Sequence, residues 1–127
     1  MPHYQVHLDE DQLDSTTGPR LIAELTEAVV SVYGEFFRPL VAIDLLGIPS
    51  GRRGLGGVVA TENAPSVTLH LREAAFSHPD HPRAPERMIA AITDAVTAVY
   101  GEEVRPRVGV RLVGIPAGRS GQGGEVR

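Results

Sequence analysis

Residues 21–57 read LIAELTEAVVSVYGEFFRPLVAIDLLGIPSGRRGLGG, and residues 88–124 repeat this segment as MIAAITDAVTAVYGEEVRPRVGVRLVGIPAGRSGQGG. About 21 of the 37 aligned positions are identical, including YGE, RP, GIP and the closing GG, which is far above chance for a single offset. The chain is therefore a duplication.

The match continues upstream of these segments. Residues 2–8 (PHYQVHL) match residues 65–71 (PSVTLHL), and a four-residue insertion separates this match from the longer one. A chain of 127 residues has the length of one domain. We therefore predict a single domain made of two repeats, 1–57 and 65–127, joined by a short linker at 58–64.

Each repeat changes its hydrophobic period twice. Apolar residues alternate with polar ones at the start, recur at helical spacing in the middle and alternate again near the end. The predicted strands begin at residues 3, 41, 66 and 108, and the predicted helices cover 21–32 and 88–99. Gly34 and Gly101 follow these helices, where a left-handed C-terminal cap is expected to end each helix. Each repeat is predicted to be a β-α-β unit.

A strand, a helix and a strand in so short a segment normally place the two strands in parallel. Two such units form an α+β fold, with one four-stranded sheet and both helices on one face. The other sheet face carries many small or apolar residues, so we expect a second subunit to cover it. The sequences GRRGLGG and GRSGQGG are read as hairpins that reach a neighbouring subunit, with flexible linkers as the alternative.

Composition excludes several classes of function. The net charge is -4, and the chain contains neither lysine nor cysteine. Nucleic-acid-binding proteins gain affinity from clustered basic residues, and zinc-thiolate sites and cysteine nucleophiles need cysteine. The sequence shows no export signal or membrane-spanning run. We expect a cytoplasmic protein without nucleic-acid or membrane partners.

Pro2 directly follows Met1, a predicted strand begins at residue 3, and the second strand of the first repeat leads to a G-x-G-G turn at 54–57. Together with the duplication, these features resemble the tautomerase superfamily, which includes 4-oxalocrotonate tautomerase, macrophage migration inhibitory factor and the cis-3-chloroacrylic acid dehalogenases. The likeness covers essentially the whole chain and is greatest to the fused, two-unit 4-oxalocrotonate tautomerases. It implies a homotrimer whose sheets line the interior, and keto–enol or dienol isomerisation of a small carboxylate without a cofactor.

The chemistry of Pro2 supports this function independently. Methionine is commonly removed before a small residue, which would leave Pro2 with a free secondary amine. An α-amino group titrates at roughly pH 8 in model peptides, and burial in an apolar pocket lowers that value. Pro2 is therefore a candidate general base and acid near neutral pH. In the alternative interpretation Pro2 only begins a strand, as its counterpart Pro65 must, since Pro65 has no free amine.

The resemblance to 4-oxalocrotonate tautomerase is incomplete where that enzyme has its two substrate arginines. The aligned positions hold Gln12 and Ala42 in the first repeat, and Ala75 and Gly109 in the second. A muconate-type dicarboxylate is therefore not the expected substrate.

The dehalogenase pattern fits better at one position. In the run His70-Leu71-Arg72-Glu73, Arg72 matches the first substrate arginine of the cis-3-chloroacrylic acid dehalogenases. Their helix histidine falls on Val29, and their water-activating glutamate falls roughly on Gln122. Hydrolytic dehalogenation is therefore not expected, and Gln122 is kept as a candidate substrate-binding residue.

Arg111 is a further candidate for binding the substrate carboxylate, because a charge in the middle of a predicted strand needs a partner. Its counterpart is Asp44, and an ion pair between the two, across repeats or subunits, is held equal to substrate binding. Arg72 is likewise either a substrate ligand or a strand-end charge.

No metal site is predicted. His7 and His70 occupy equivalent positions, but neither they nor His78 and His81 have the spacing of a metal site. Two alternatives to a tautomerase remain. One is a hydratase or decarboxylase that uses a protonated Pro2, and the other is a noncatalytic trimeric binding domain.

Overall fold

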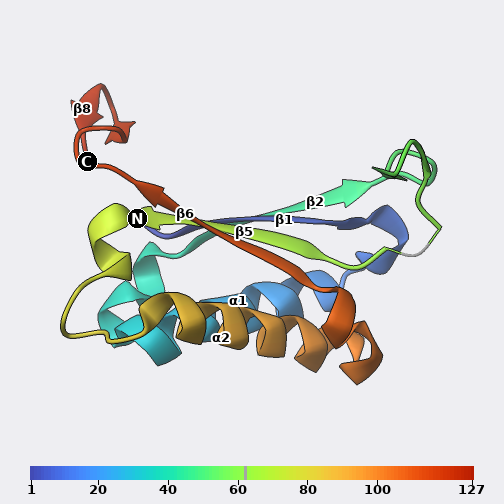
Figure 1. Ribbon diagram of the computed structural model, residues 1–127, viewed down its shortest axis with the longest axis horizontal. Helices are drawn as coiled ribbons and strands as arrows, with labels where there is room; N and C mark the ends of the chain where they lie inside the picture. Colours follow the sequence, from blue (N-terminus) through green and yellow to red (C-terminus); the bar gives the residue numbers. More distant parts are fainter. Residues whose placement is uncertain (62) are drawn as a thin grey trace.

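The computed structural model describes residues 1–61 and 63–127 (Figure 1). Each repeat folds as a strand, a helix and a second strand. These are β1 (His3–Asp9), α1 (Thr17–Tyr33) and β2 (Ala42–Ile48) in the first repeat, and β5 (Ser66–Arg72), α2 (Ala84–Tyr100) and β6 (Gly109–Ile115) in the second. The β-α-β prediction is confirmed for both repeats, and each main element equals its counterpart in length.

The four long strands form one sheet in the order β2-β1-β5-β6. The strands within each repeat pair in parallel, and β1 meets β5 antiparallel. Gln5 lies opposite Thr68, its own repeat counterpart, so an approximate two-fold axis passes between these residues. Both helices cover the same face of the sheet (Figure 1). The predicted α+β architecture is confirmed.

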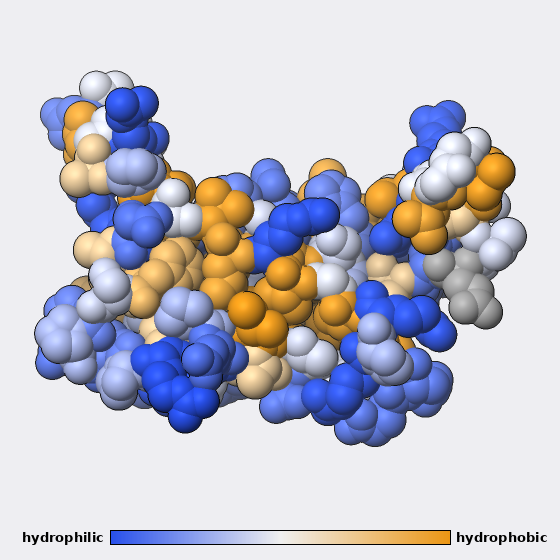
Figure 2. All heavy atoms as spheres, in the orientation of Figure 1, coloured by the Kyte–Doolittle hydropathy of each residue, from blue (hydrophilic) through white to orange (hydrophobic). Residues whose placement is uncertain are grey.

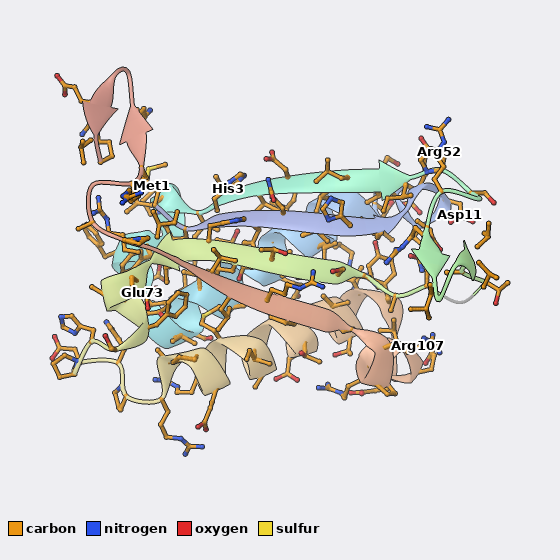
Figure 3. The ribbon with its side chains drawn as sticks, turned by 45° about the horizontal axis from the view of Figure 1, so that its top comes forward. Met1, His3, Asp11, Arg52, Glu73 and Arg107 are labelled. Atoms are coloured by element: carbon orange, nitrogen blue, oxygen red, sulfur yellow. The ribbon has the colours of Figure 1, made fainter. Side chains whose placement is uncertain are left out.

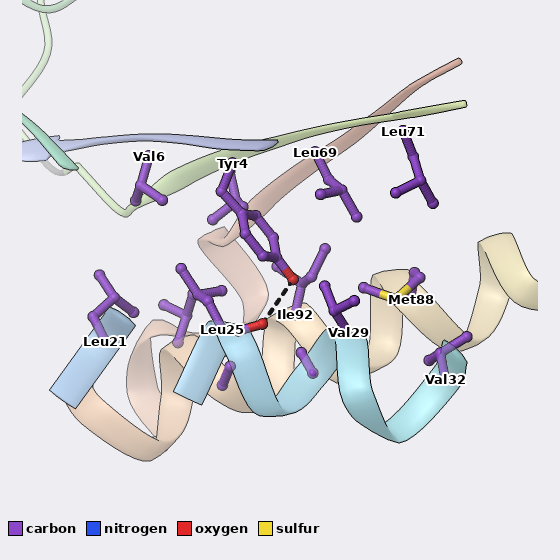
Figure 4. Close-up of a cluster of buried hydrophobic side chains, with 14 of the residues drawn as sticks. Tyr4, Val6, Leu21, Leu25, Val29, Val32, Leu69, Leu71, Met88 and Ile92 are labelled. Atoms are coloured by element: carbon purple, nitrogen blue, oxygen red, sulfur yellow. Dashed lines mark hydrogen bonds between the residues drawn. The ribbon is translucent and has the colours of Figure 1, made fainter. Parts of the chain in front are cut away.

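The core lies between the sheet and the two helices (Figure 4). Alternate strand residues point toward the helices and are fully or almost fully buried: Tyr4, Val6 and Leu8 in β1, and Val67, Leu69 and Leu71 in β5. Beneath them lie Leu21, Leu25 and Val29 of α1 and Met88 and Ile92 of α2, all of them fully buried. The period-2 and helical patterns in the sequence thus correspond to the two sides of one core.

Both helices end at the predicted glycines, but these have extended ψ values of 168° and 161° and not the left-handed helical conformation that was expected. Gly34 and Gly101 have φ values of 103° and 100°, which a residue with a side chain rarely adopts. Their N–H groups still donate to the carbonyls of Val30 and Thr97, each at 2.8 Å. Among the described residues, no helix is both long and apolar enough to cross a membrane.

The two glycine-rich segments form hairpins, which the sequence analysis favoured over flexible linkers. They consist of β3 (Gly54–Leu55) with β4 (Val58–Val59), and β7 (Gly121–Gln122) with β8 (Glu125–Val126). The expected linker at 58–64 therefore begins with a hairpin strand, while residue 62 lies outside the described residues. The hairpins rise from opposite ends of the sheet on the side away from the helices, and the surface is hollowed between them (Figure 2).

Candidate active site

Pro2 is held rigidly at the start of β1. Its side chain is fully buried, and its carbonyl accepts a hydrogen bond of 2.9 Å from the N–H of Ala42 in β2. Met1 before it is 62% exposed. Figure 3 shows Met1 and His3 at the end of the sheet where the β7–β8 hairpin stands. The ring of Pro2 is thus fixed by packing, and Met1 lies where its removal uncovers the nitrogen.

A cavity of about 640 Å³ opens beside Pro2 on the helix-distal side of the sheet. It is lined by Met1, Pro2, His3, Gln5, Ala42, His70, Arg72, Ile115, Ser120, Gly121, Gln122 and Arg127. Three of the four predicted site residues, Pro2, Arg72 and Gln122, therefore meet in one cavity. We call it the polar cavity, because most of its lining side chains carry hydrogen-bonding groups.

A second cavity of about 470 Å³ also reaches Pro2 and Arg72. Its other lining residues are mostly apolar or aromatic: Met1, Tyr33, Phe36, Phe37, Leu40, Leu71, Ala74, Ala75, His78 and His81. We call it the aromatic cavity. Burial raises the pKa of Tyr33, and its hydroxyl donates to the Ala75 carbonyl at 3.1 Å, so Tyr33 is a protonated, fixed part of the wall. Pro2 and Arg72 thus stand where a polar and an apolar space meet.

Arg72 is the last residue of β5, and the backbone around it is fixed by close packing. A Cβ atom at Gly114 of β6 would lie 3.2 Å from the Cα of Glu73, so a side chain there would push the short helix η3 (Glu73–Phe76) away from β6 by a few tenths of an ångström. Arg72 is exposed and has no ion pair among the described residues. Its guanidinium is therefore available to a carboxylate, for which its paired N–H groups are well shaped.

Gln122 reaches the polar cavity because the β7–β8 hairpin folds back on itself. The N–H of Arg127 donates to the Ser120 carbonyl at 2.9 Å, and the Ser120 hydroxyl donates to the Arg127 carbonyl at 2.6 Å. The same closure places Arg127 in the cavity wall. Sequence reasoning missed Arg127, because its counterpart Ala60 gives no signal in the repeat.

Arg111 does not join the other candidates. It lies in β6 in register with Thr68, and the row continues through Gln5 to Asp44 in β2. Arg111 and Asp44 therefore stand on opposite edges of the sheet, and the ion pair proposed for them does not form within the chain. Asp44 is bound instead by His3, whose Nε2 lies 2.8 Å from Oδ2 of Asp44.

His70 lies opposite His3 in the sheet and not opposite His7, its counterpart in the repeat. The antiparallel register places His3 opposite His70, with ring centroids 6.2 Å apart, and His7 opposite Ser66. No cluster of three or more His, Asp or Glu side chains suited to a metal ion occurs within residues 1–61 and 63–127. His3 and His70 both line the polar cavity, and sequence reasoning assigned neither to the Pro2 site.

No protein-family profile and no curated protein sequence matches this chain. Solved structures do match. The wild-type asymmetric trimer of the fused 4-OT protein F6 has a TM-score of 0.81 at 23% identity, covering 98% of this chain and 94% of that one. Pt0534 inactivated by 2-oxo-3-pentynoate has a TM-score of 0.75 at 19% identity, with 98% and 93% covered.

A member of the cis-3-chloroacrylic acid dehalogenase family, N1, has a TM-score of 0.78 at 19% identity, with 98% of this chain and 82% of that one covered. At these identities the likeness establishes the fold. The chain has the two-repeat β-α-β fold of the fused 4-OT structures, which is the tautomerase fold that its sequence resemblance predicted.

Proposed function

We propose that this protein is a tautomerase-superfamily enzyme that moves a proton between carbon and oxygen of a small 2-oxo or unsaturated carboxylic acid, with Pro2 as the general base and acid. One observation carries the proposal: Pro2 is fully buried beside a cavity that also holds an arginine without an ion pair in the described chain, Arg72. Such a pairing of a fixed basic group with a carboxylate ligand suits proton transfer next to a carbonyl.

The proposed roles follow from the chemistry of each group. After loss of Met1, Pro2 has a secondary amine, and burial near a guanidinium favours its neutral form. The neutral amine takes a proton from C3 of the 2-oxo acid and returns one in the reverse reaction. Arg72 binds the carboxylate with its two-pronged guanidinium, and the Gln122 amide donates a hydrogen bond to the 2-oxygen as negative charge develops there. These roles require no cofactor.

The proposal includes a homotrimer. Large apolar side chains are exposed on the β3–β4 hairpin, where Leu55, Val58 and Val59 are 76%, 69% and 58% exposed, and on the helix-distal sheet face at Leu46 and Val113. A second subunit would cover them. The similar fused 4-OT protein F6 is a trimer. A solution mass of one chain at micromolar concentration would contradict this part.

The central test is a spectrophotometric assay of ketonisation, with the monocarboxylate phenylenolpyruvate as the main substrate and the dicarboxylate 2-hydroxymuconate as the comparison that is expected to react more slowly. The protein with Met1 removed, verified by intact mass, is compared with Pro2→Ala and with the matched variant Pro65→Ala. We expect Pro2→Ala to lose turnover by a factor of about 10² to 10⁴, while Pro65→Ala keeps it, since the nitrogen of Pro65 lies in a peptide bond. Pro2→Ala still has a primary α-amine, so the protein that retains Met1 is measured as well, and equal rates with and without Met1 would remove the amine from the mechanism.

A covalent probe gives a second readout that does not depend on choosing the right substrate. The alkyne of 2-oxo-3-pentynoate is activated by its carbonyl, so a neutral amine adds to it. We expect one adduct per chain, on the tryptic peptide of residues 2–20, and none on a protein that retains Met1. Labelling elsewhere, or equal labelling of both forms, would contradict a free and reactive Pro2.

A second candidate function is addition of water to, or decarboxylation of, an unsaturated acid by a protonated Pro2. It is favoured by the position of Arg72 before Glu73 and by the similar fold of N1. The two functions need opposite protonation states of the amine. Titration of ¹⁵N-labelled Pro2 by NMR distinguishes them, because a tautomerase base is largely neutral at neutral pH and the hydrating acid is protonated.

A further inference from the structure

A histidine–carboxylate pair lies directly beside Pro2. His3 is the next residue along β1, and Ala42 lies opposite it in β2, so Asp44 stands two residues farther along the same face. The Nε2 atom of His3 is 2.8 Å from Oδ2 of Asp44, and the two side chains are 39% and 64% exposed. The repeat counterpart of His3 is Ser66, so the duplicated scaffold does not require this pair.

The location of His3 distinguishes it from an ordinary surface ion pair. Its side chain lines the polar cavity together with Pro2, Arg72 and Gln122. Among the described residues, the only hydrogen bond of the imidazole is the one at Nε2. The second ring nitrogen, Nδ1, therefore remains available to a molecule bound in the cavity.

The carboxylate also determines which nitrogen carries the proton. A neutral His3 donates its Nε2 hydrogen to Asp44, which leaves the lone pair on Nδ1. When Nδ1 takes up a proton, the Asp44 charge stabilises the imidazolium, as a carboxylate does in other histidine–carboxylate pairs. The charged or titratable groups that face His3 are Asp44 from β2, His70 and Arg72 from β5, and Arg127 from the hairpin; the helices pack on the opposite face.

We propose that His3 is a second proton-transfer residue of the Pro2 reaction, acting at the substrate's 2-oxygen, with Asp44 as its positioning residue. This inference rests on the proposed tautomerase function and adds a division of labour to it. Pro2 handles the proton at C3, and His3 handles the proton at the oxygen.

The step balances in both directions. In enolisation, the neutral Pro2 nitrogen takes the C3 proton, the C3–H electrons form the C2=C3 bond, and the C2=O π electrons take the Nδ1 proton of the His3 imidazolium. Ketonisation reverses each transfer: His3 Nδ1 accepts the enol proton while the Pro2 ammonium protonates C3. After enolisation Pro2 is protonated and His3 is neutral, the reverse of their starting states. Proton exchange with water restores both groups for the next turnover.

The test compares His3→Gln, Asp44→Asn and the double variant with wild type in the ketonisation assay, measured from pH 5 to pH 10. Glutamine keeps a side-chain amide near Asp44 but cannot take up a proton. We expect kcat for His3→Gln to fall about 100-fold with little change in KM, and the shape of the pH–rate profile to change, because glutamine cannot exchange a proton with the substrate. Asp44→Asn is expected to lower kcat in the same way, because an amide that donates to Nε2 reverses the imidazole tautomer.

The double variant gives a readout that a merely structural role would not produce. If the two residues act as one unit, the double variant is no slower than His3→Gln alone, whereas independent effects multiply. The matched control is His7→Gln, on the same strand and face but outside the lining of both cavities beside Pro2, and it should keep the wild-type profile. Solution mass and circular dichroism confirm assembly and folding for each variant.

Two failures are distinguishable. Wild-type turnover that depends on Pro2, with kcat and the pH–rate profile unchanged in His3→Gln, overturns the role of His3 and leaves the tautomerase proposal standing. A wild type without Pro2-dependent turnover overturns both.

Discussion

The two ends of the sheet are related by the duplication and yet are equipped differently. Pro2 and Pro65 each precede the first strand of their repeat, and each carbonyl accepts a hydrogen bond from the neighbouring parallel strand, from Ala42 at 2.9 Å and Gly109 at 3.3 Å. Each end also has a hairpin and a cavity, of about 640 Å³ beside Pro2 and about 570 Å³ at the other end. The scaffold is thus the same at both ends.

The charges are not the same. Where the Pro2 end has Arg72, the other end has Asp9, and where it has Ser120, the other end has Arg53. Arg53 lies 3.5 Å from Asp9 and donates to the Ala64 carbonyl at 3.1 Å. The charges of Arg53 and Asp9 therefore neutralise each other, while Arg72 has no such partner in the described chain. Divergence at a few positions therefore separates a candidate active site from a structural end, without changing the backbone.

The largest effect on turnover is expected when the Pro2 nitrogen is converted to a peptide amide, as it is in Pro65. A protein with one extra residue fixed before Pro2 has an amide nitrogen there, as Pro65 has, and an amide is not a base. We expect turnover to fall by a factor of about 10² to 10⁴. Removing the extra residue with a protease should restore the rate, measured on the same sample. Full activity before cleavage would break the proposed distinction between the ends.

The next largest effect, on kcat/KM, is expected from removing the charge of Arg72 at the end of β5. Arg72→Ala removes the proposed carboxylate ligand, and hydrogen bonds to a charged group contribute about 1.5 to 3 kcal/mol. This corresponds to a loss of roughly 10- to 150-fold in kcat/KM, most of it through KM if Arg72 binds substrate and transition state equally. Arg107→Ala makes the same charge change at the opposite end (Figure 3) and should leave the kinetics unchanged. A similar loss in both variants would indicate a general charge effect.

A substitution at the Pro65 end is expected to have the opposite effect: it lowers the stability of the protein and leaves turnover unchanged. Asp9→Ala leaves Arg53, whose side chain is only 20% exposed, without its carboxylate, although the bond to Ala64 remains. We expect a loss of about 1 kcal/mol in the free energy of unfolding, between the values for exposed and buried pairs, and a Tm lower by roughly 3 to 5 °C. Turnover should not change. Asp11→Ala, a nearby exposed carboxylate, is the control, and an equal Tm shift there would remove the Asp9–Arg53 pair as the cause.

The sequence predicts the fold of this protein more completely than it predicts the residues around the Pro2 cavity. The fold is predictable because each β-α-β pattern occurs twice, so the periodicity of one repeat supports that of the other. The candidates Pro2 and Arg72 come from local sequence: Pro2 follows Met1 at the start of a predicted strand, and Arg72 stands in the run at residues 70–73 that resembles the dehalogenases. Arg127 and His3 are not predictable in this way. Arg127 reaches the cavity only through closure of the hairpin, and His3 meets His70 only through the antiparallel register of β1 with β5. The hairpin closure recurs in the first repeat, where the N–H of Ala60 donates to the Arg53 carbonyl at 2.8 Å, but Ala60 carries no charge that would draw attention to this position. The pairing of His3 with His70 joins two different repeats, so the duplication gives no signal for it.

The smallest effect tests the asymmetry of the core. Tyr4 and its counterpart Val67 are both fully buried, but only Tyr4 has a polar group there, and its hydroxyl donates to the Leu25 carbonyl at 3.0 Å (Figure 4). Tyr4→Phe should lower the free energy of unfolding by about 1 kcal/mol at pH 7, measured by urea denaturation.

The effect of this substitution should also depend on pH. Burial raises the pKa of Tyr4 above its ordinary value, so the folded form keeps its proton while the unfolded chain loses it above roughly pH 10. The contribution of the hydroxyl is therefore complete below that pH and declines as the pH rises further, and the difference between wild type and Tyr4→Phe should shrink between pH 9 and pH 11. A difference that stays constant over this interval would mean that the Tyr4 hydroxyl ionises as readily in the folded protein as in the unfolded chain.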